Sequence, residues 1–158
     1  MCLDYKTRKG QIHPKIFIFD GELVAFKVFR FINKKLHFPF YDNKEGIDID
    51  KWIVDNKCGL IVGRKPYINC EKSTGKYPYG FHSFTERKGA DSLYRALNRS
   101  LPNETKVIPI LVREIVAKGW QNVKGWKDLD SAIVSKHIFI HTPKMRKEIL
   151  NEYNRNRS

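Results

Sequence analysis

The chain lacks the features that assign a protein quickly to a known class. Its 158 residues include only three cysteines, without Cys-x-x-Cys spacing, so neither a disulfide framework nor a zinc site is expected. No apolar run reaches the roughly 18 residues of a membrane span, and the N-terminus is polar, which together predict a cytoplasmic protein without a membrane partner. Phosphate-binding glycine loops, His-Glu-x-x-His motifs, Gly-x-Ser-x-Gly elbows and paired-carboxylate motifs are also missing. We therefore expect a binding protein rather than an enzyme, with no cofactor and no metal.

Acidic residues are in short supply. The 17 Asp and Glu residues face 30 Lys and Arg residues, and the formal net charge is +13. Such a charge attracts nucleotides, nucleic acids or acidic proteins over about a Debye length, roughly 10 Å at moderate salt. The basic residues are spread along the whole chain rather than gathered in one tail. The alternative is therefore a solvated cationic surface that only aids solubility.

A β-hairpin near the N-terminus is the clearest local signal. Two apolar runs, Lys15–Phe19 and Glu22–Phe31, flank Asp20-Gly21, a pair that readily adopts the positive φ angles of a type I′ turn. Lys27 and Arg30 interrupt the two faces of the second run. They either reach solvent at a sheet edge or contact a ligand.

The rest of the chain predicts a single α+β domain over 1–158, a mostly antiparallel twisted sheet with an N-terminal hairpin, a central helix and a C-terminal helix. Further strands are expected at 58–63, 106–117 and 132–140, helices from Glu86 to about Asn98 and from Pro143 onward, and loops at 34–46, 64–75 and 119–126. Ile47–Val54 fits either a strand or a helix. Residues 1–12 are expected to form a loose basic arm or edge segment, and 154–158 a frayed tail.

The stretch from Tyr77 to Leu97 combines an aromatic strand with a helix. A strand period of two places Tyr77, Tyr79, Phe81 and Ser83 on one side and His82 on the other. Thr85 then caps the helix, so His82, Ser83 and Thr85 lie at a strand-to-helix junction. Free backbone N–H groups and the helix dipole favour an anion there, and Arg87 and Lys88 add charge.

Two residues are candidates for catalysis. Cys2 would become an N-terminal nucleophile if Met1 were removed, and is otherwise an inert small residue. His82 could act as an acid or base or donate to a phosphate, or it could be a structural histidine. His137 and His141 form only a weak candidate metal pair, since no carboxylate or cysteine stands nearby in sequence.

Basic and aromatic residues alternate in a way typical of nucleotide or single-stranded nucleic-acid binding. The alternative is that many of these aromatics belong to the core. The aromatic and basic pattern includes Phe26, Tyr67, Tyr77 and Trp120. The residues expected to bind the ligand are Lys27, Arg30, Arg64, Tyr79, Phe81, His82, Ser83, Thr85, Arg87 and Lys88.

Four segments carry a resemblance: Phe26–Phe29, Tyr79–Ala90, Val107–Gly119 and Ala132–Ile140. Together they resemble small, mostly uncharacterised phage and bacterial proteins that commonly begin Met-Cys-Leu, as Met1–Leu3 does. A more distant similarity is to ADP-ribosyltransferase-like folds. Those enzymes carry a catalytic glutamate on a late strand, and this chain offers only Glu114, so the similarity implies a binding protein rather than a transferase.

The leading hypothesis is a phage-type basic protein that binds a phosphorylated nucleotide at the strand-to-helix junction and thereby sequesters or degrades a nucleotide signal of host defence. A non-catalytic nucleic-acid-binding protein and an inhibitor of an acidic host protein are the alternatives. An enzyme dependent on Cys2 or His82 and a homo-oligomer both remain open.

Overall fold

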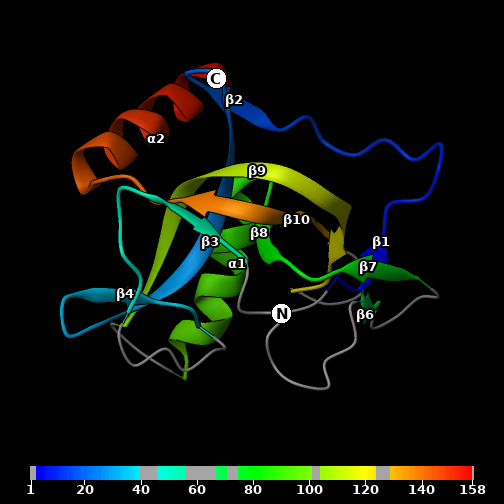
Figure 1. The fold of residues 1–158 in the computed structure, drawn as a ribbon, viewed down its shortest axis with the longest axis horizontal. Helices are drawn as coiled ribbons and strands as arrows, with labels where there is room; N and C mark the ends of the chain where they lie inside the picture. Colours follow the sequence, from blue (N-terminus) through cyan, green and yellow to red (C-terminus); the bar gives the residue numbers. More distant parts are fainter. Residues whose placement is uncertain are drawn as a thin grey trace.

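The computed structural model describes residues 3–39, 46–55, 67–70, 75–100, 104–123 and 129–157. Most of this chain is one antiparallel sheet with two helices (Figure 1), which confirms the predicted α+β class. The predicted strand at 58–63, together with Cys2, Cys58 and Arg64, lies outside the described residues.

The N-terminal hairpin forms as predicted. Strands β2 (Phe17–Phe19) and β3 (Glu22–Ile32) pair antiparallel, and both Asp20 (φ 49°) and Gly21 (φ 76°) have the positive φ of a type I′ turn. The next turn uses the same geometry, with Asn33 and Lys34 at positive φ, and leads into β4 (Lys35–His37). The predicted 34–46 loop therefore begins with a strand.

Two long strands form the centre of the sheet. β9 (Thr105–Gln121) pairs with β3 through its first half and with β10 (Asp130–Phe139) through its second half. β8 (Phe81–Phe84) joins β10 to β3, so β3, β9, β10 and β8 close a circuit. The loop predicted at 119–126 begins later than expected, because β9 continues to Gln121. Gly119 and Trp120 pair with the edge strand β1 (Tyr5–Lys6). The predicted basic arm is thus partly an edge strand.

Shorter strands complete the sheets. β5 (Trp52–Val54) pairs with β10, which decides Ile47–Val54 in favour of a strand, and β7 (Lys76–Pro78) pairs with β6 (Tyr67–Asn69) in a separate ribbon. Pairing between β9 and β10 slips by one residue, where 115–117 opposes 134–135, and the neighbouring Glu114 has a φ of 55°. This β-bulge bends the long strand.

Both helices pack against one face of the sheet. α1 (Arg87–Asn98) supplies Leu93, and α2 (Pro143–Arg157) supplies Ile149 and Tyr153, to one hydrophobic cluster. Sheet residues on that face alternate with those of a second cluster on the other face. The first cluster also contains Val24, Phe26, Tyr77, Phe84 and Val134, and the second contains Ala25, Phe29, Ile110, Ile133 and Ile138. α2 extends to Arg157 and therefore includes most of the predicted frayed tail. None of the described helices is long and apolar enough to cross a membrane.

Candidate functional site

The predicted strand-to-helix junction is assembled differently from the expected anion site. The strand breaks at Tyr79-Gly80, between β7 and β8, and the break resets the alternation of side chains. Tyr77 therefore shares a face with His82, while Phe81 lies in the second cluster, stacked on Phe38 at a centroid distance of 5.6 Å. The expected grouping of Tyr77 with Phe81 is wrong for this reason.

His82 points into the protein. It is 7% exposed, and its Nε2 lies 3.1 Å from the hydroxyl of Tyr77, which also accepts the backbone N–H of Leu3 at 2.7 Å. Burial, and then the positive charge of Lys27, lower the pKa of His82 to about 3. The neutral imidazole is thus a structural link between β8 and the N-terminal segment, not an acid or base exposed to a ligand.

Ser83 and Thr85 are also inside. Ser83 is fully buried, and its hydroxyl has no hydrogen-bond partner among the described residues. The Thr85 hydroxyl contacts the Ser131 hydroxyl, and the backbone N–H of Thr85 donates to the Ser131 carbonyl at 3.1 Å. Glu86 rather than Thr85 occupies the N-cap of α1, without a side-chain capping bond, so the predicted Thr85 cap is wrong.

The N-terminus of α1 is occupied by the C-terminal helix. The backbone N–H of Arg87 donates to the Tyr153 hydroxyl at 3.3 Å, and Arg157 lies 2.9 Å from the Glu86 carboxylate. Lys88 is 3.7 Å from the same carboxylate, and Arg87 is 3.7 Å from Asp91. Protein groups thus supply the negative charge that the junction was expected to take from a ligand.

The two cations of β3 have partners in the fold. Lys27 was expected either to reach solvent at a sheet edge or to contact a ligand. It is instead 8% exposed in the centre of the sheet, where its ammonium donates to the His82 carbonyl at 2.5 Å. Arg30 is ion-paired with Glu104 at 2.9 Å. Tyr79 is half-buried, and its carbonyl accepts a bond from Lys136 at 2.6 Å. Among the described members of the predicted ligand-binding set, Thr85 lines a hollow of about 560 Å³, whereas Arg87 and Lys88 line another of about 350 Å³, so these members do not converge on one cleft.

His137, in β10, and His141, two residues after the end of β10, have different partners. His137 lies 3.1 Å from the carboxylate of Glu114, whereas His141 packs edge-on against Phe139 at a centroid distance of 4.7 Å. Across the described segments, no three His, Cys, Asp or Glu side chains come together as a metal site would require.

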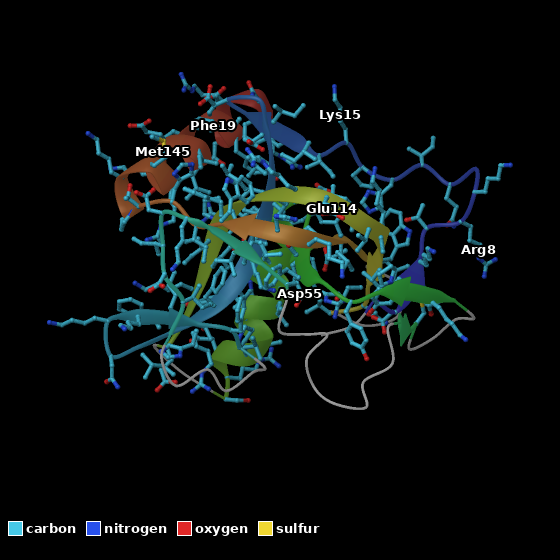
Figure 2. The ribbon with its side chains drawn as sticks, in the orientation of Figure 1. Arg8, Lys15, Phe19, Asp55, Glu114 and Met145 are labelled. Carbon is cyan, nitrogen blue, oxygen red and sulfur yellow. The ribbon has the colours of Figure 1, made fainter. Side chains whose placement is uncertain are left out.

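An open cationic surface lies instead along the edge formed by β1, the segment that follows it, β7 and the end of β9. We call it the basic edge. Its exposed cations are Lys6, Arg8, Lys9, Lys15, Lys76 and Lys118. Figure 2 shows Arg8 and Lys15 projecting away from the ribbon.

Backbone contacts bring the parts of the basic edge together. Tyr5 and Lys6 pair with Trp120 and Gly119, the Thr7 N–H donates to the Lys118 carbonyl at 2.8 Å, and the Lys6 ammonium donates to the Lys76 carbonyl at 3.3 Å. In Figure 1 β1 and β7 lie beside each other at the right of the molecule. Cations from three distant parts of the sequence therefore share one edge.

The basic edge carries almost no negative charge. Asp4 is the one carboxylate in residues 3–16, 75–80 and 117–123, and it is buried, accepting the backbone N–H of Asn122 at 2.6 Å. In the described part of the chain, no carboxylate forms a salt bridge with any of the six cations. Their charge is therefore available to an anion from solution.

Half-buried aromatic rings lie among these cations. Tyr5 and Trp120 are direct cross-strand partners, and the rings of Trp120 and His13 are 5.3 Å apart. Trp120 stands two residues from Lys118, so both project from the same face of β9. Sequence reasoning included Trp120 among the basic and aromatic residues but missed the edge, because its members come together only through the pairing of β1 with β9.

No protein-family model matches the chain, and no curated protein or solved structure matches it. The resemblance to phage and bacterial proteins and the similarity to ADP-ribosyltransferase-like folds therefore stay predictions, and the geometry of the basic edge is the basis for a functional assignment.

Proposed function

We propose that the protein binds single-stranded nucleic acid along the basic edge, without catalysis. The observation that carries this proposal is the set of six exposed cations that lack carboxylate partners in the described structure and surround partly accessible aromatic rings. Lysine and arginine contact backbone phosphates, and aromatic faces stack on bases regardless of sequence. An extended edge of this kind suits a strand that runs along the surface.

This surface favours a polyanion over a mononucleotide. A small nucleotide is usually held in a concave pocket by a few convergent polar groups. At the junction, where such a pocket was expected, the histidine and both hydroxyls are buried and the helix N-terminus already contacts Tyr153 and Glu86. The cations of the basic edge stand at the ends of long, flexible side chains that are spread along the surface. This arrangement suits contacts with several phosphates of one strand better than contacts with a single phosphate.

Fluorescence anisotropy with a labelled single-stranded oligonucleotide at several salt concentrations tests the proposal. Each phosphate contact on a single strand contributes about −0.7 to the slope of log K against log salt. Replacing Lys6, Lys76 and Lys118 by Gln is expected to weaken binding at low salt and to reduce the slope by about 2. A Tyr5→Leu variant should weaken binding further by reducing stacking, with little change in slope.

The matched control removes the same charge elsewhere. Lys34, Lys144 and Lys147 are exposed residues outside the basic edge, and their triple replacement by Gln lowers the net charge equally. Equal losses in the two triple variants would show that only net charge matters and would refute an interface at the basic edge. Preferential binding of a mononucleotide with weak salt dependence would restore the nucleotide hypothesis instead.

A further inference from the structure

A hollow lined by carboxylates, which we call the acidic hollow, lies on the helix-covered face of the sheet, away from the basic edge. It has a volume of about 660 Å³ and receives residues from the β2–β3 hairpin, from β5, β9 and β10, and from α2. Its lining is Phe19, Asp20, Glu22, Trp52, Leu111, Phe139, His141, Met145, Glu148 and Glu152. Figure 2 shows Phe19 and Met145 close to each other at this end of the molecule. The volume is in the range typical of small-molecule sites, about 300–1,000 Å³.

The charge of this hollow is opposite to that of the chain. Its ten described lining residues include four carboxylates and neither Lys nor Arg, in a protein of net charge +13. Asp20, Glu148 and Glu152 form no salt bridge within the described structure. Glu148 and Glu152 are four residues apart on α2, and like charges at this spacing are neighbours on the helix surface and repel each other. A cation between them would relieve that repulsion.

The apolar part of the lining is aromatic. Trp52 and Phe139 are cross-strand partners whose rings lie 5.4 Å apart, and His141 packs edge-on against Phe139. Leu111, Phe19 and Met145 add aliphatic, aromatic and thioether surface around them. An apolar body could therefore rest on these side chains while a charged group reaches the carboxylates.

The protein already seats one cation at the rim of this hollow. The guanidinium of Arg113 lies 4.0 Å from the centroid of the Trp52 ring, and its Nε is 3.1 Å from both carboxylate oxygens of Glu22. The hydrogen bond from Arg113 lowers the pKa of Glu22, which keeps that carboxylate ionised. Arg113 thus demonstrates, within the chain, how an aromatic face and a carboxylate hold a planar cation.

We propose that this hollow is a binding site for a small organic cation, an alkylammonium or guanidinium compound with an apolar body. Glu148, Glu152 and Asp20 attract the charged group, and Trp52, Phe139 and Met145 contact the body. The aromatic lining argues against a metal ion, which would prefer a compact set of oxygen ligands. This inference is independent of nucleic-acid binding, because the hollow and the basic edge share no residue.

Titrations followed by NMR of the Trp52 indole N–H test the proposal, with benzylamine and agmatine as probes and benzyl alcohol as the uncharged comparison. Both amines are expected to bind with dissociation constants of about 1 mM or tighter, and benzyl alcohol more weakly by about tenfold. The Glu148→Gln/Glu152→Gln variant should bind both amines about five- to tenfold more weakly, as expected for two partly exposed charge pairs.

The control variant carries Asp48→Asn and Glu104→Gln, which remove the same charge from an exposed and a half-buried position outside the hollow and should leave amine binding unchanged. Circular dichroism confirms that α2 stays folded in both variants. Equal affinity for benzyl alcohol and benzylamine, or an equal loss in both double variants, would overturn the proposal. Binding of a Lys- and Arg-rich decapeptide without binding of either amine would overturn it in favour of a protein partner.

Discussion

Acidification should destabilise the protein through His82 more than through any other histidine in the described structure. The imidazole is 7% exposed and hydrogen-bonded to Tyr77, and burial followed by the charge of Lys27 lowers its pKa from 6.5 to about 3. A histidine whose pKa is lower in the folded state binds fewer protons there than in the unfolded chain. Its contribution to stability is therefore complete above pH 6.5 and is lost as the pH falls toward 3.

The size of the effect follows from the two pKa values. Over the whole range the difference corresponds to about 5 kcal/mol, an upper limit at 1.36 kcal/mol per unit. An experiment between pH 8 and pH 5 measures only part of this free-energy difference, because the folded-state pKa lies below pH 5. Between pH 8 and pH 5, linkage predicts a loss of about 2 kcal/mol from His82, which is a large fraction of the stability of a typical domain.

Urea unfolding of the wild type and of a His82→Gln variant at pH 8 and pH 5 measures this contribution. Glutamine keeps a polar group near Tyr77 but does not titrate, so the variant is expected to lose about 2 kcal/mol less than the wild type on acidification. Contributions of the other four histidines cancel in the comparison. An unchanged difference between the two pH values, or a His82 ring that titrates near 6.5 in NMR spectra, would refute the burial argument.

Two further predictions concern backbone positions. Gly89→Ala should destabilise the protein by about 1–2 kcal/mol in urea unfolding, because a Cβ there would lie 2.6 Å from the Phe84 ring. This clash outweighs the gain in helix propensity from alanine, and a more stable variant would contradict the prediction. Glu114→Val should cost about 1–2 kcal/mol relative to Glu114→Gln, since a β-branched residue is strained at a φ of 55°; if valine stabilises, as it would in a regular strand, the bulge geometry is wrong.

Local patterns were sufficient where the structure depends on neighbouring residues. Asp20-Gly21 predicted the hairpin because the turn needs two adjacent residues that tolerate positive φ. The helix after Glu86 and the helix after Pro143 followed from spacing and terminal residues alone. These elements and the α+β class were therefore predictable from the sequence.

Distant pairing decided what the sequence could not predict. Gly119 was expected to begin a loop, but it lies within β9. Glycine is needed there because a Cβ would lie 2.2 Å from the carbonyl oxygen of Tyr5 in the paired edge strand β1. Gly80 similarly faces the backbone of β10, and the break beside it turns His82 toward Tyr77. At the junction, the backbone N–H of Arg87 and the carboxylate of Glu86 are contacted by Tyr153 and Arg157, which belong to α2, far along the chain. No pattern within 77–97 contains that information.

The arrangement of charge, rather than its sum, determines where an anion would bind. A Debye length of about 8 Å at physiological salt limits an exposed charge to its immediate surroundings. Lys27, Arg30, Arg87 and Arg157 contribute to the net charge of +13 but lie beside acceptors or carboxylates of the protein itself. The cations of the basic edge form no salt bridge with a carboxylate of the described structure, while the carboxylates of the acidic hollow repel the same anion. If the protein binds nucleic acid as proposed, the strand would therefore be directed to the edge formed by β1, β7 and the end of β9.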